Sequence, residues 1–209
     1  METAKRRAIR KAVEASLGIG LVLSVLLSVV GFDARCSEIR ENVLRLHVLA
    51  NSDSEEDQAL KLRVRDAVLK AGEEVFAGAN TEQEALQAAK ENVDKLQLAA
   101  EAEIARCGYH YPVAVEVGRT RFDTRIYDTF TLPAGEYEAV RVLIGKAEGR
   151  NWWCVMFPAV CLPAAEEPGE LSDVLEDDAL NIVENPDRFT FRFKAVEIYE
   201  NVRDWFAGL

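Results

Sequence analysis

The residues best suited to chemistry gather around His47, one of two histidines in the chain. It is followed by Ser52, Asp53, Ser54 and Asp57, and hydroxyl and carboxylate groups beside an imidazole are the components of nucleophilic and acid–base sites. Turns and helix N-caps select the same polar residue types for backbone reasons alone. We favour this structural interpretation, and keep an exported hydrolase or metal-dependent enzyme that uses His47 with Asp53 or Asp57 as the alternative.

The sequence contains no established motif for a metal or cofactor site. Asn51, Asp53 and Asp57 could offer oxygens to Ca²⁺, but the segment lacks the glycine and the distal glutamate of an EF-hand loop. The chain contains no His-Glu-x-x-His, Gly-x-Ser-x-Gly, Cys-x-x-Cys or glycine-rich phosphate loop. We therefore expect no metal, no cofactor and no catalytic residues.

A strand that runs directly into a helix positions these polar residues. Leu44, Leu46 and Val48 alternate with polar residues, which is the period-2 pattern of a half-buried strand. Ser54 then has the type and place of an N-cap, and the acidic residues at 55–57 match the positive end of a helix dipole. The sequence therefore predicts that a helix begins at this turn.

The following residues predict one more helix and then several strands. A capping box at Thr81–Glu84 starts a helix that Gly108 ends. Period-2 segments follow at 113–117, 126–132, 137–144 and 151–157, and we expect the last two to pair as a hairpin in an antiparallel meander. The predicted fold class is α+β. Residues 38–163 form a two-layer sandwich, with a mainly antiparallel sheet of about four to six strands and two helices on one face, and a hydrophobic helix precedes them.

The first 34 residues have the layout of a targeting segment. Basic residues at 5–11 precede an apolar run over 17–32, which is shorter than the about 20 residues that a membrane-spanning helix needs. We expect residues 1–34 to be a signal peptide or an N-terminal membrane anchor, and the remainder to be exported. The net charge of −11 argues against nucleic acid as a partner, and leaves the N-terminal segment as the one predicted membrane contact.

Two pairs of residues near the end of this domain could serve folding or recognition. Cys154 and Cys161 lie on either side of a proline, and in an exported protein they could form a disulfide or remain buried thiols. Trp152 and Trp153 point to opposite faces if they lie in a strand. An exposed tryptophan near Arg141 would have the composition of a binding hot spot, whereas both could equally be covered.

The C-terminal part divides into an acidic segment and a closing element. Residues 164–188 are predicted to form a solvated acidic linker with at most one short helix. Residues 189–209 start with alternating phenylalanines, as in a strand, and continue as an amphipathic helix. This helix could cap the sandwich, bind a partner or touch a membrane. Glu197, Glu200 and Asp204 on its polar side make membrane contact the least favoured of the three.

Three blocks of the sequence closely resemble one family, stage II sporulation protein R of endospore-forming Firmicutes. The blocks are LHVLANSDSEEDQALKLRVRDAV over 46–68, PAGEYEAVRVLIG over 133–145 and NWWCVMFP over 151–158. The similarity extends over roughly 39–162, and the segment from Phe193 to Phe206 is similar to the C-terminal element of the family.

The resemblance implies a signalling protein and no enzymatic activity. Such proteins are made in the forespore, exported across its membrane into the intermembrane space, and required to activate the mother cell's membrane-embedded aspartic peptidase, which processes pro-sigma-E. We therefore expect a surface that binds this peptidase. The candidate contact residues are His47, Asn51, Asp53, Asp57, Arg141, Trp152 and Trp153.

Overall fold

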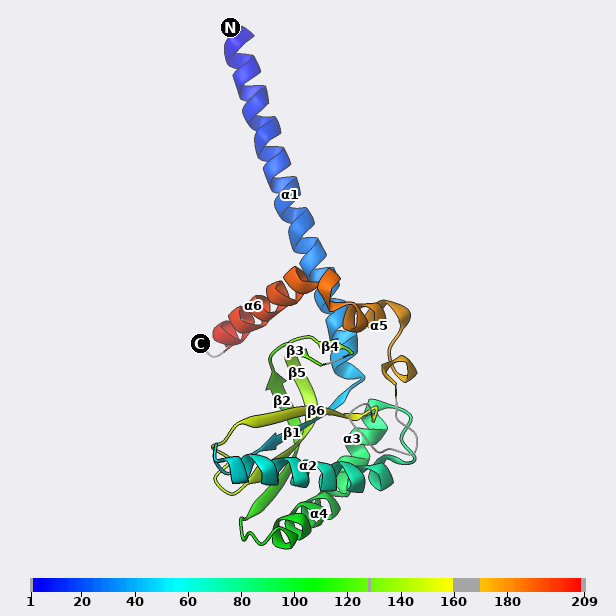
Figure 1. Cartoon of the computed structure of the whole chain (residues 1–209). Helices are drawn as coiled ribbons and strands as arrows, with labels where there is room; N and C mark the ends of the chain where they lie inside the picture. Colours follow the sequence, from blue (N-terminus) through cyan, green and yellow to red (C-terminus); the bar gives the residue numbers. More distant parts are fainter. Residues whose placement is uncertain (1, 128, 160–169, 208–209) are drawn as a thin grey trace.

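The computed structural model describes residues 2–127, 129–159 and 170–207, and the domain is built around a four-stranded sheet (Figure 1). The strands lie in the order β2-β5-β1-β6, with β1 and β5 parallel and the other neighbours antiparallel. Their bounds are Leu44–Leu49 for β1, Val113–Phe122 for β2, Gly135–Ile144 for β5 and Asn151–Phe157 for β6. The predicted α+β class with a mainly antiparallel sheet is confirmed.

β1 occupies the interior of the sheet, where it separates β5 from β6. In the register, Val48 lies beside Val142 of β5 on one side and beside Trp152 of β6 on the other. The predicted hairpin between residues 137–144 and 151–157 is therefore wrong, and the sheet is not a simple meander. The reason is that β1 is buried along nearly its whole length, so it needs a neighbouring strand on each side.

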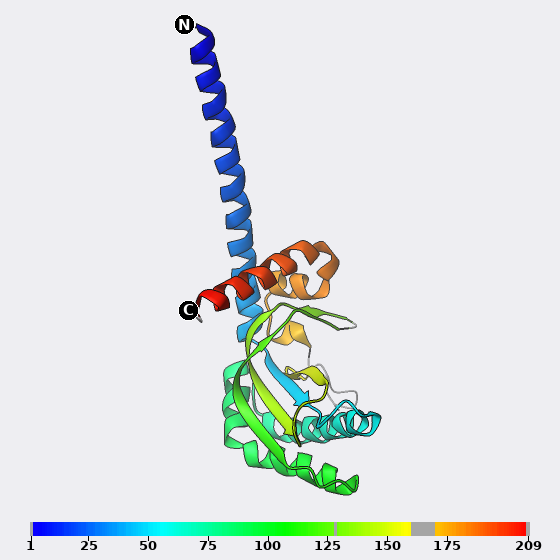
Figure 2. The same cartoon turned by 90° about the vertical axis from the view of Figure 1, so that its left-hand side faces the viewer.

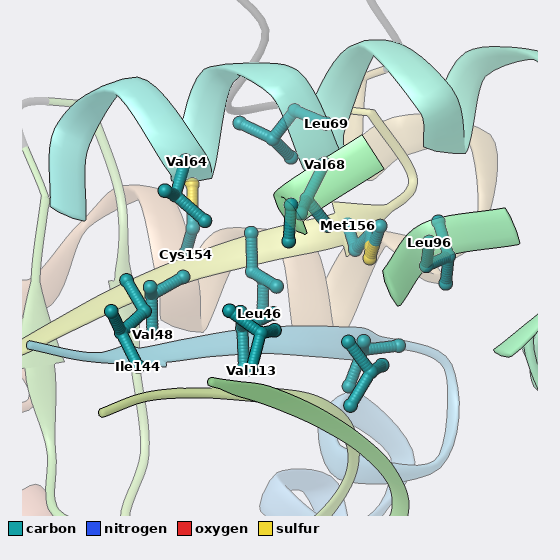
Figure 3. Close-up of a cluster of buried hydrophobic side chains, with 14 of the residues drawn as sticks. Leu46, Val48, Val64, Val68, Leu69, Leu96, Val113, Ile144, Cys154 and Met156 are labelled. Carbon is teal, nitrogen blue, oxygen red and sulfur yellow. The ribbon is translucent and has the colours of Figure 1, made fainter. Parts of the chain in front are cut away.

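Three helices cover one face of the sheet: α2 (Glu55–Phe76), α3 (Glu82–Glu91) and α4 (Val93–Arg106). Val64 and Val68 lie one turn apart on α2 and pack in one apolar cluster with Leu46 and Val48 of β1 (Figure 3). The single helix predicted to start at the capping box is divided at Asn92, which ends α3 and begins α4. Its apolar residues continue across the break, so the helical layer lies on one face as predicted.

A long N-terminal helix, α1 (Glu2–Glu41), projects from the folded domain (Figures 1 and 2). Its part Val13–Glu41 is long and apolar enough to cross a membrane by length and composition, and no other helix among the described residues is. Near the C-terminal end of α1, Phe32, Cys36 and Ile39 are buried. The helix therefore continues past the predicted targeting segment and enters the domain core.

The C-terminal part of the chain packs on this end of α1. It contains the 3-10 turns Leu171–Asp173 and Pro186–Arg188 and the helices α5 (Asp177–Glu184) and α6 (Thr190–Ala207). Leu171, Leu175 and Ile182 are buried in a second apolar cluster that includes Phe32. The predicted solvated linker is thus a packed part of the domain over residues 171–188. Its residues 164–169 lie outside the described residues.

The acidic composition of this segment obscured its helical spacing. Buried apolar residues recur at 171, 175, 179 and 182, which is the stripe of a helical segment with one packed side. The alternating phenylalanines that suggested a strand also lie in a helix or at its start. Phe193 is buried on α6, whereas Phe191 is 92% exposed, because residues two apart on a helix point to nearly opposite sides.

Leu171→Ala tests whether the acidic segment is part of the core. Because Leu171 is buried, we expect its truncation to lower the free energy of unfolding by about 2–4 kcal/mol. Leu98→Ala on α4 is the matched control, because truncation of an exposed leucine should change the stability by less than about 0.5 kcal/mol. Urea unfolding measures both variants, and equal midpoints would show that residues 171–188 add nothing to the core.

Candidate functional site

The predicted polar turn is closed by hydrogen bonds to the loop between β5 and β6. Asn51 uses both ends of its amide: Nδ2 donates to Asp57 Oδ2 at 2.8 Å, and Oδ1 accepts from the backbone N–H of Lys146 at 3.0 Å. Ser52 Oγ donates to the same Asp57 oxygen at 2.5 Å. Ser54 caps α2 as predicted, because its hydroxyl accepts from the backbone N–H of Asp57.

Asp53 completes the contact between these two loops, which we call the loop lock. Its Oδ1 accepts from the backbone N–H of Arg150 at 2.6 Å, and Lys61 Nζ donates to the Arg150 carbonyl oxygen at 2.9 Å. The backbone N–H of Gly149 donates to the Ala50 carbonyl oxygen at 2.9 Å. The polar residues that suggested chemistry therefore hold the β5–β6 loop against the start of α2.

The electrostatics of Asp57 agree with this structural role. Burial of the carboxyl group raises its pKa, but the hydrogen bonds from Ser52, Asn51 and Tyr111 outweigh burial and leave the pKa below its usual value. The group is therefore an ionised acceptor at neutral pH, with its oxygens committed to the turn. A carboxylate held in this way is poorly suited to donate a proton to a substrate.

On the sheet face away from the helices, aromatic rings surround a buried arginine. Arg45 of β1 is 0% exposed, and its guanidinium lies 3.9 Å from the ring centroid of Phe122 and 4.8 Å from that of Tyr137. Its Nη2 donates to the hydroxyl oxygen of Tyr127 at 2.5 Å. Burial lowers the pKa of Arg45, and the aromatic faces and the hydroxyl replace part of the lost hydration.

His47 lies on the same face and stacks on Trp153, with 3.7 Å between the ring centroids. Its Nε2 lies 3.0 Å from Asn151 Oδ1, and its Nδ1 is buried without a hydrogen-bond partner. Burial lowers the pKa of His47 to about 4, while the Asn151 contact opposes the shift and nearby arginines add to it. Neither imidazole nitrogen forms a hydrogen bond with Asp53 or Asp57. The structure therefore does not assemble the alternative catalytic site of His47 with Asp53 or Asp57.

An open groove of about 420 Å³ lies beside β6, where the aromatic face meets the helical layer. It is lined by Arg65, Arg125, Ile126, Tyr127, Asn151, Trp152, Trp153 and Cys154. The two tryptophans point to opposite faces of the sheet. Trp152 packs with the apolar cluster under α2, and Trp153 packs with Phe122 on the other face. An arginine lies over each ring, at 4.4 Å for Trp152 and 5.0 Å for Trp153.

The strand predicted over 126–132 is instead two short paired strands, β3 (Arg125–Ile126) and β4 (Thr131–Leu132), and β3 forms one wall of the groove. Ile126 is 81% exposed there, an unusual position for an isoleucine. The signal in the sequence for this wall is the combination of cations and aromatic residues in RFDTRIYDTF over 121–130. The contribution of this segment to the groove becomes apparent only when the tertiary structure shows which face of the sheet it covers.

The remaining predicted contact residue, Arg141, lies beside His47 in the register between β5 and β1. Arg141 is half-buried on β5 and pairs with Glu116 of β2 at 2.9 Å.

Cys154 is disulfide-bonded, whereas Cys36 and Cys107 are free. Cys161 lies outside the described residues, so its pairing with Cys154 stays a prediction. The part of the chain that the structure describes holds no group of three or more His, Cys, Asp or Glu side chains placed to bind a metal ion.

Gly149→Ala should break the loop lock. A Cβ atom at Gly149 would overlap the backbone carbonyl group of Ser52, which is fixed by the turn. We expect the substitution to lower the free energy of unfolding by about 1–3 kcal/mol. Gly118→Ala in β2 is the matched control, because nothing lies within 4 Å of an added Cβ there. Thermal unfolding compares the two, and a Gly149→Ala protein as stable as the control would refute the lock.

His47→Phe should change how stability depends on pH. The pKa of about 4 in the folded chain lies below the usual 6.5, so between these values the unfolded chain binds a proton that the folded chain does not. The free energy of unfolding therefore falls as the pH falls from about 6.5 to about 4. Phenylalanine keeps a ring against Trp153 and cannot titrate. Urea unfolding at a series of pH values should give a shallower slope for the variant, and parallel curves would contradict this assignment.

Comparison with known proteins places this fold in a family. Residues 40–167 match the family model for stage II sporulation protein R. Over 123 residues the chain is 35% identical to stage II sporulation protein R of Bacillus subtilis (strain 168), a match that covers 59% of this chain and 55% of the relative's length. No solved structure matches the chain. The matched region contains the loop lock, the buried arginine and the groove, and the chain belongs to the stage II sporulation protein R family.

Proposed function

We propose that this protein is a sporulation signal, made in the forespore and exported, that activates the mother cell's membrane-embedded aspartic peptidase for processing of pro-sigma-E. Membership of the sporulation protein R family over residues 40–167 is the observation that carries the proposal. An N-terminal apolar helix is compatible with export, either as a signal peptide or as an anchor. The folded domain would then lie in the intermembrane space.

The packing of α1 indicates which cleavage site would leave the core of the domain intact. Phe32 is buried against Phe189 and Phe193, with ring centroids 5.7 and 5.5 Å away, and Asp33 pairs with Arg40 at 3.0 Å. Removal of residues 1–34 would therefore take away part of the core. A cut after Gly31 would leave this packing in place, and small or medium residues precede it, so cleavage, if it occurs, is expected there.

The groove beside β6 is the surface that we assign to the peptidase. Its arginines and half-buried tryptophans are the residue types that dominate binding hot spots, and the exposed Ile126 adds an apolar contact at the rim. A segment with acidic and apolar side chains, from an extracytoplasmic loop of the peptidase, would complement it. In contrast, the polar groups of Asn51, Asp53 and Asp57 are engaged in the loop lock, and we assign them to the fold.

Activation requires that the signal bind one state of the peptidase more tightly than the other. A ligand shifts a conformational equilibrium only by the difference between its affinities for the two states. Binding in a preformed groove held by rigid aromatic packing limits the entropy lost on association. The protein would thus act as an external ligand, and the peptidase would supply all of the catalytic residues.

Ile126→Glu should separate binding from folding. Because Ile126 is 81% exposed, the substitution leaves the fold intact, but it places a carboxylate at the rim of the groove, where it repels an acidic partner segment. In cells that express the full chain, the peptidase and pro-sigma-E, we expect at least about tenfold weaker co-purification and a loss of processing. Leu98→Glu, an equally charged change on exposed α4, should behave as the unsubstituted protein.

Two results would count against the proposal at different levels. Equal processing with both variants would remove the groove as the contact surface while leaving the function intact. Processing of pro-sigma-E that continues after deletion of the whole gene in a spore former would remove the signalling function itself. Turnover of a substrate that is lost in His47→Ala but not in Ile126→Glu would favour the enzymatic alternative.

A further inference from the structure

The C-terminal helix α6 exposes an apolar stripe. Phe191, Ile198, Val202 and Trp205 are all exposed large hydrophobic residues, and Tyr199 borders them. Their offsets of seven, four and three residues place the first four on one side of the helix. An exposed row of this kind, with two aromatic residues near its ends, is more than the scattered surface hydrophobics of an ordinary domain.

The opposite side of α6 is the one that packs on the protein. Phe193 and Val196 are buried in the second apolar cluster, and Glu200 is buried beside them. On the flank of the helix, Arg121 Nη2 of β2 donates to Asn201 Oδ1 at 2.9 Å. The helix is therefore fixed on the domain by one side, and its apolar stripe faces away from the domain.

The position of α6 relative to α1 indicates what covers the stripe. α6 begins against Phe32, at the point where the exposed apolar part of α1 ends, and it runs across α1 (Figures 1 and 2). In both views the sheet lies on one side of α6 and the long exposed part of α1 lies on the other. A bilayer around α1 would have its surface at the level of Phe32, and so at the level of α6.

The apolar surface of α1 is continuous with this stripe. Leu17, Leu21, Leu27 and Val30 of α1 are exposed large hydrophobic residues, and in the uncleaved chain a lipid bilayer would cover them. Aromatic residues such as Tyr199 and Trp205 are enriched at membrane–water interfaces because their rings are amphipathic. Two of the three acidic residues that argued against membrane contact in the sequence do not oppose this arrangement. Glu200 lies on the packed side, and Glu197 pairs with Lys194 at 3.0 Å.

We propose that α6 lies on the surface of the membrane that α1 crosses, with Phe191, Ile198, Val202 and Trp205 in the boundary between head groups and acyl chains. The covering partner is the lipid bilayer itself. The membrane contact of this protein is then formed by two helices, one crossing and one lying flat, which together fix the height and the tilt of the sheet above the membrane. This inference goes beyond the proposed signalling function and is independent of the partner bound.

Depth-dependent quenching of Trp205 fluorescence in phosphatidylcholine vesicles tests the proposal. The full chain with Trp152→Phe and Trp153→Phe retains Trp205 as its one tryptophan. We expect stronger quenching by lipids brominated near the head group than by lipids brominated deep in the acyl chain. The matched control carries Trp152→Phe and Trp205→Phe, so that Trp153, on the sheet, reports instead. Its emission should be unchanged by either lipid. Co-flotation with the vesicles confirms in each case that α1 is inserted.

Charge variants separate lipid contact from mere proximity to α1. Ile198→Glu and Val202→Glu together should abolish the quenching of Trp205, because carboxylates do not enter the acyl region, whereas Leu98→Glu should leave it unchanged. An inserted protein whose Trp205 is quenched by neither lipid would overturn the proposal. So would quenching that survives both glutamates, or a protection of Trp205 that appears only as protein concentration rises, which would assign the stripe to a second copy of the chain.

Discussion

The burial of β1 on both faces is the constraint on which the rest of the structure depends. One face is apolar and packs under α2, as the alternation of Leu44, Leu46 and Val48 requires. The other face carries Arg45 and His47, whose removal from water is unfavourable unless other groups replace the hydration. Phe122, Tyr137 and Trp153 cover these side chains, and Tyr127 supplies a hydroxyl oxygen. The segment that contains β3 and β4 lies over this face of the sheet because Tyr127 contacts Arg45 there. The groove lies at the edge of this segment.

The same strand explains why residues with catalytic chemistry have a structural role here. β1 ends where α2 begins, and the β5–β6 loop has to pass this junction because β1 separates its two strands. Asn51 and Asp53 accept hydrogen bonds from backbone N–H groups of that loop, and Asp57 holds the side chain of Asn51 in place. Buried polar groups need such partners, and a set that is fully used stabilises one arrangement of the loops. A histidine kept neutral by burial and stacked on a tryptophan likewise stabilises the cover of the sheet.

The N-terminal helix is packed rigidly into this domain at its C-terminal end. The last turns of α1 share a core with α5 and α6, so the apolar segment and the folded domain form one packed unit at Phe32. If α1 crosses a membrane, as we propose, this packing fixes the distance between the groove and the lipid. A fixed distance of this kind would suit the proposed role as a ligand of a membrane-embedded peptidase. It also makes α6 a natural contact with the same surface.

The sequence by itself determined the local elements: the strand at 44–49, the N-caps at Ser54 and Thr81, the apolar N-terminal segment and the blocks that identify the family. These depend on neighbours within a few residues, where periodicity and capping are specific. Tertiary structure alone decided that β1 lies between β5 and β6, that residues 171–188 are packed, and that Arg125 and Ile126 line a groove. A period reports which face of an element is buried, but it carries no information about which distant segment covers that face.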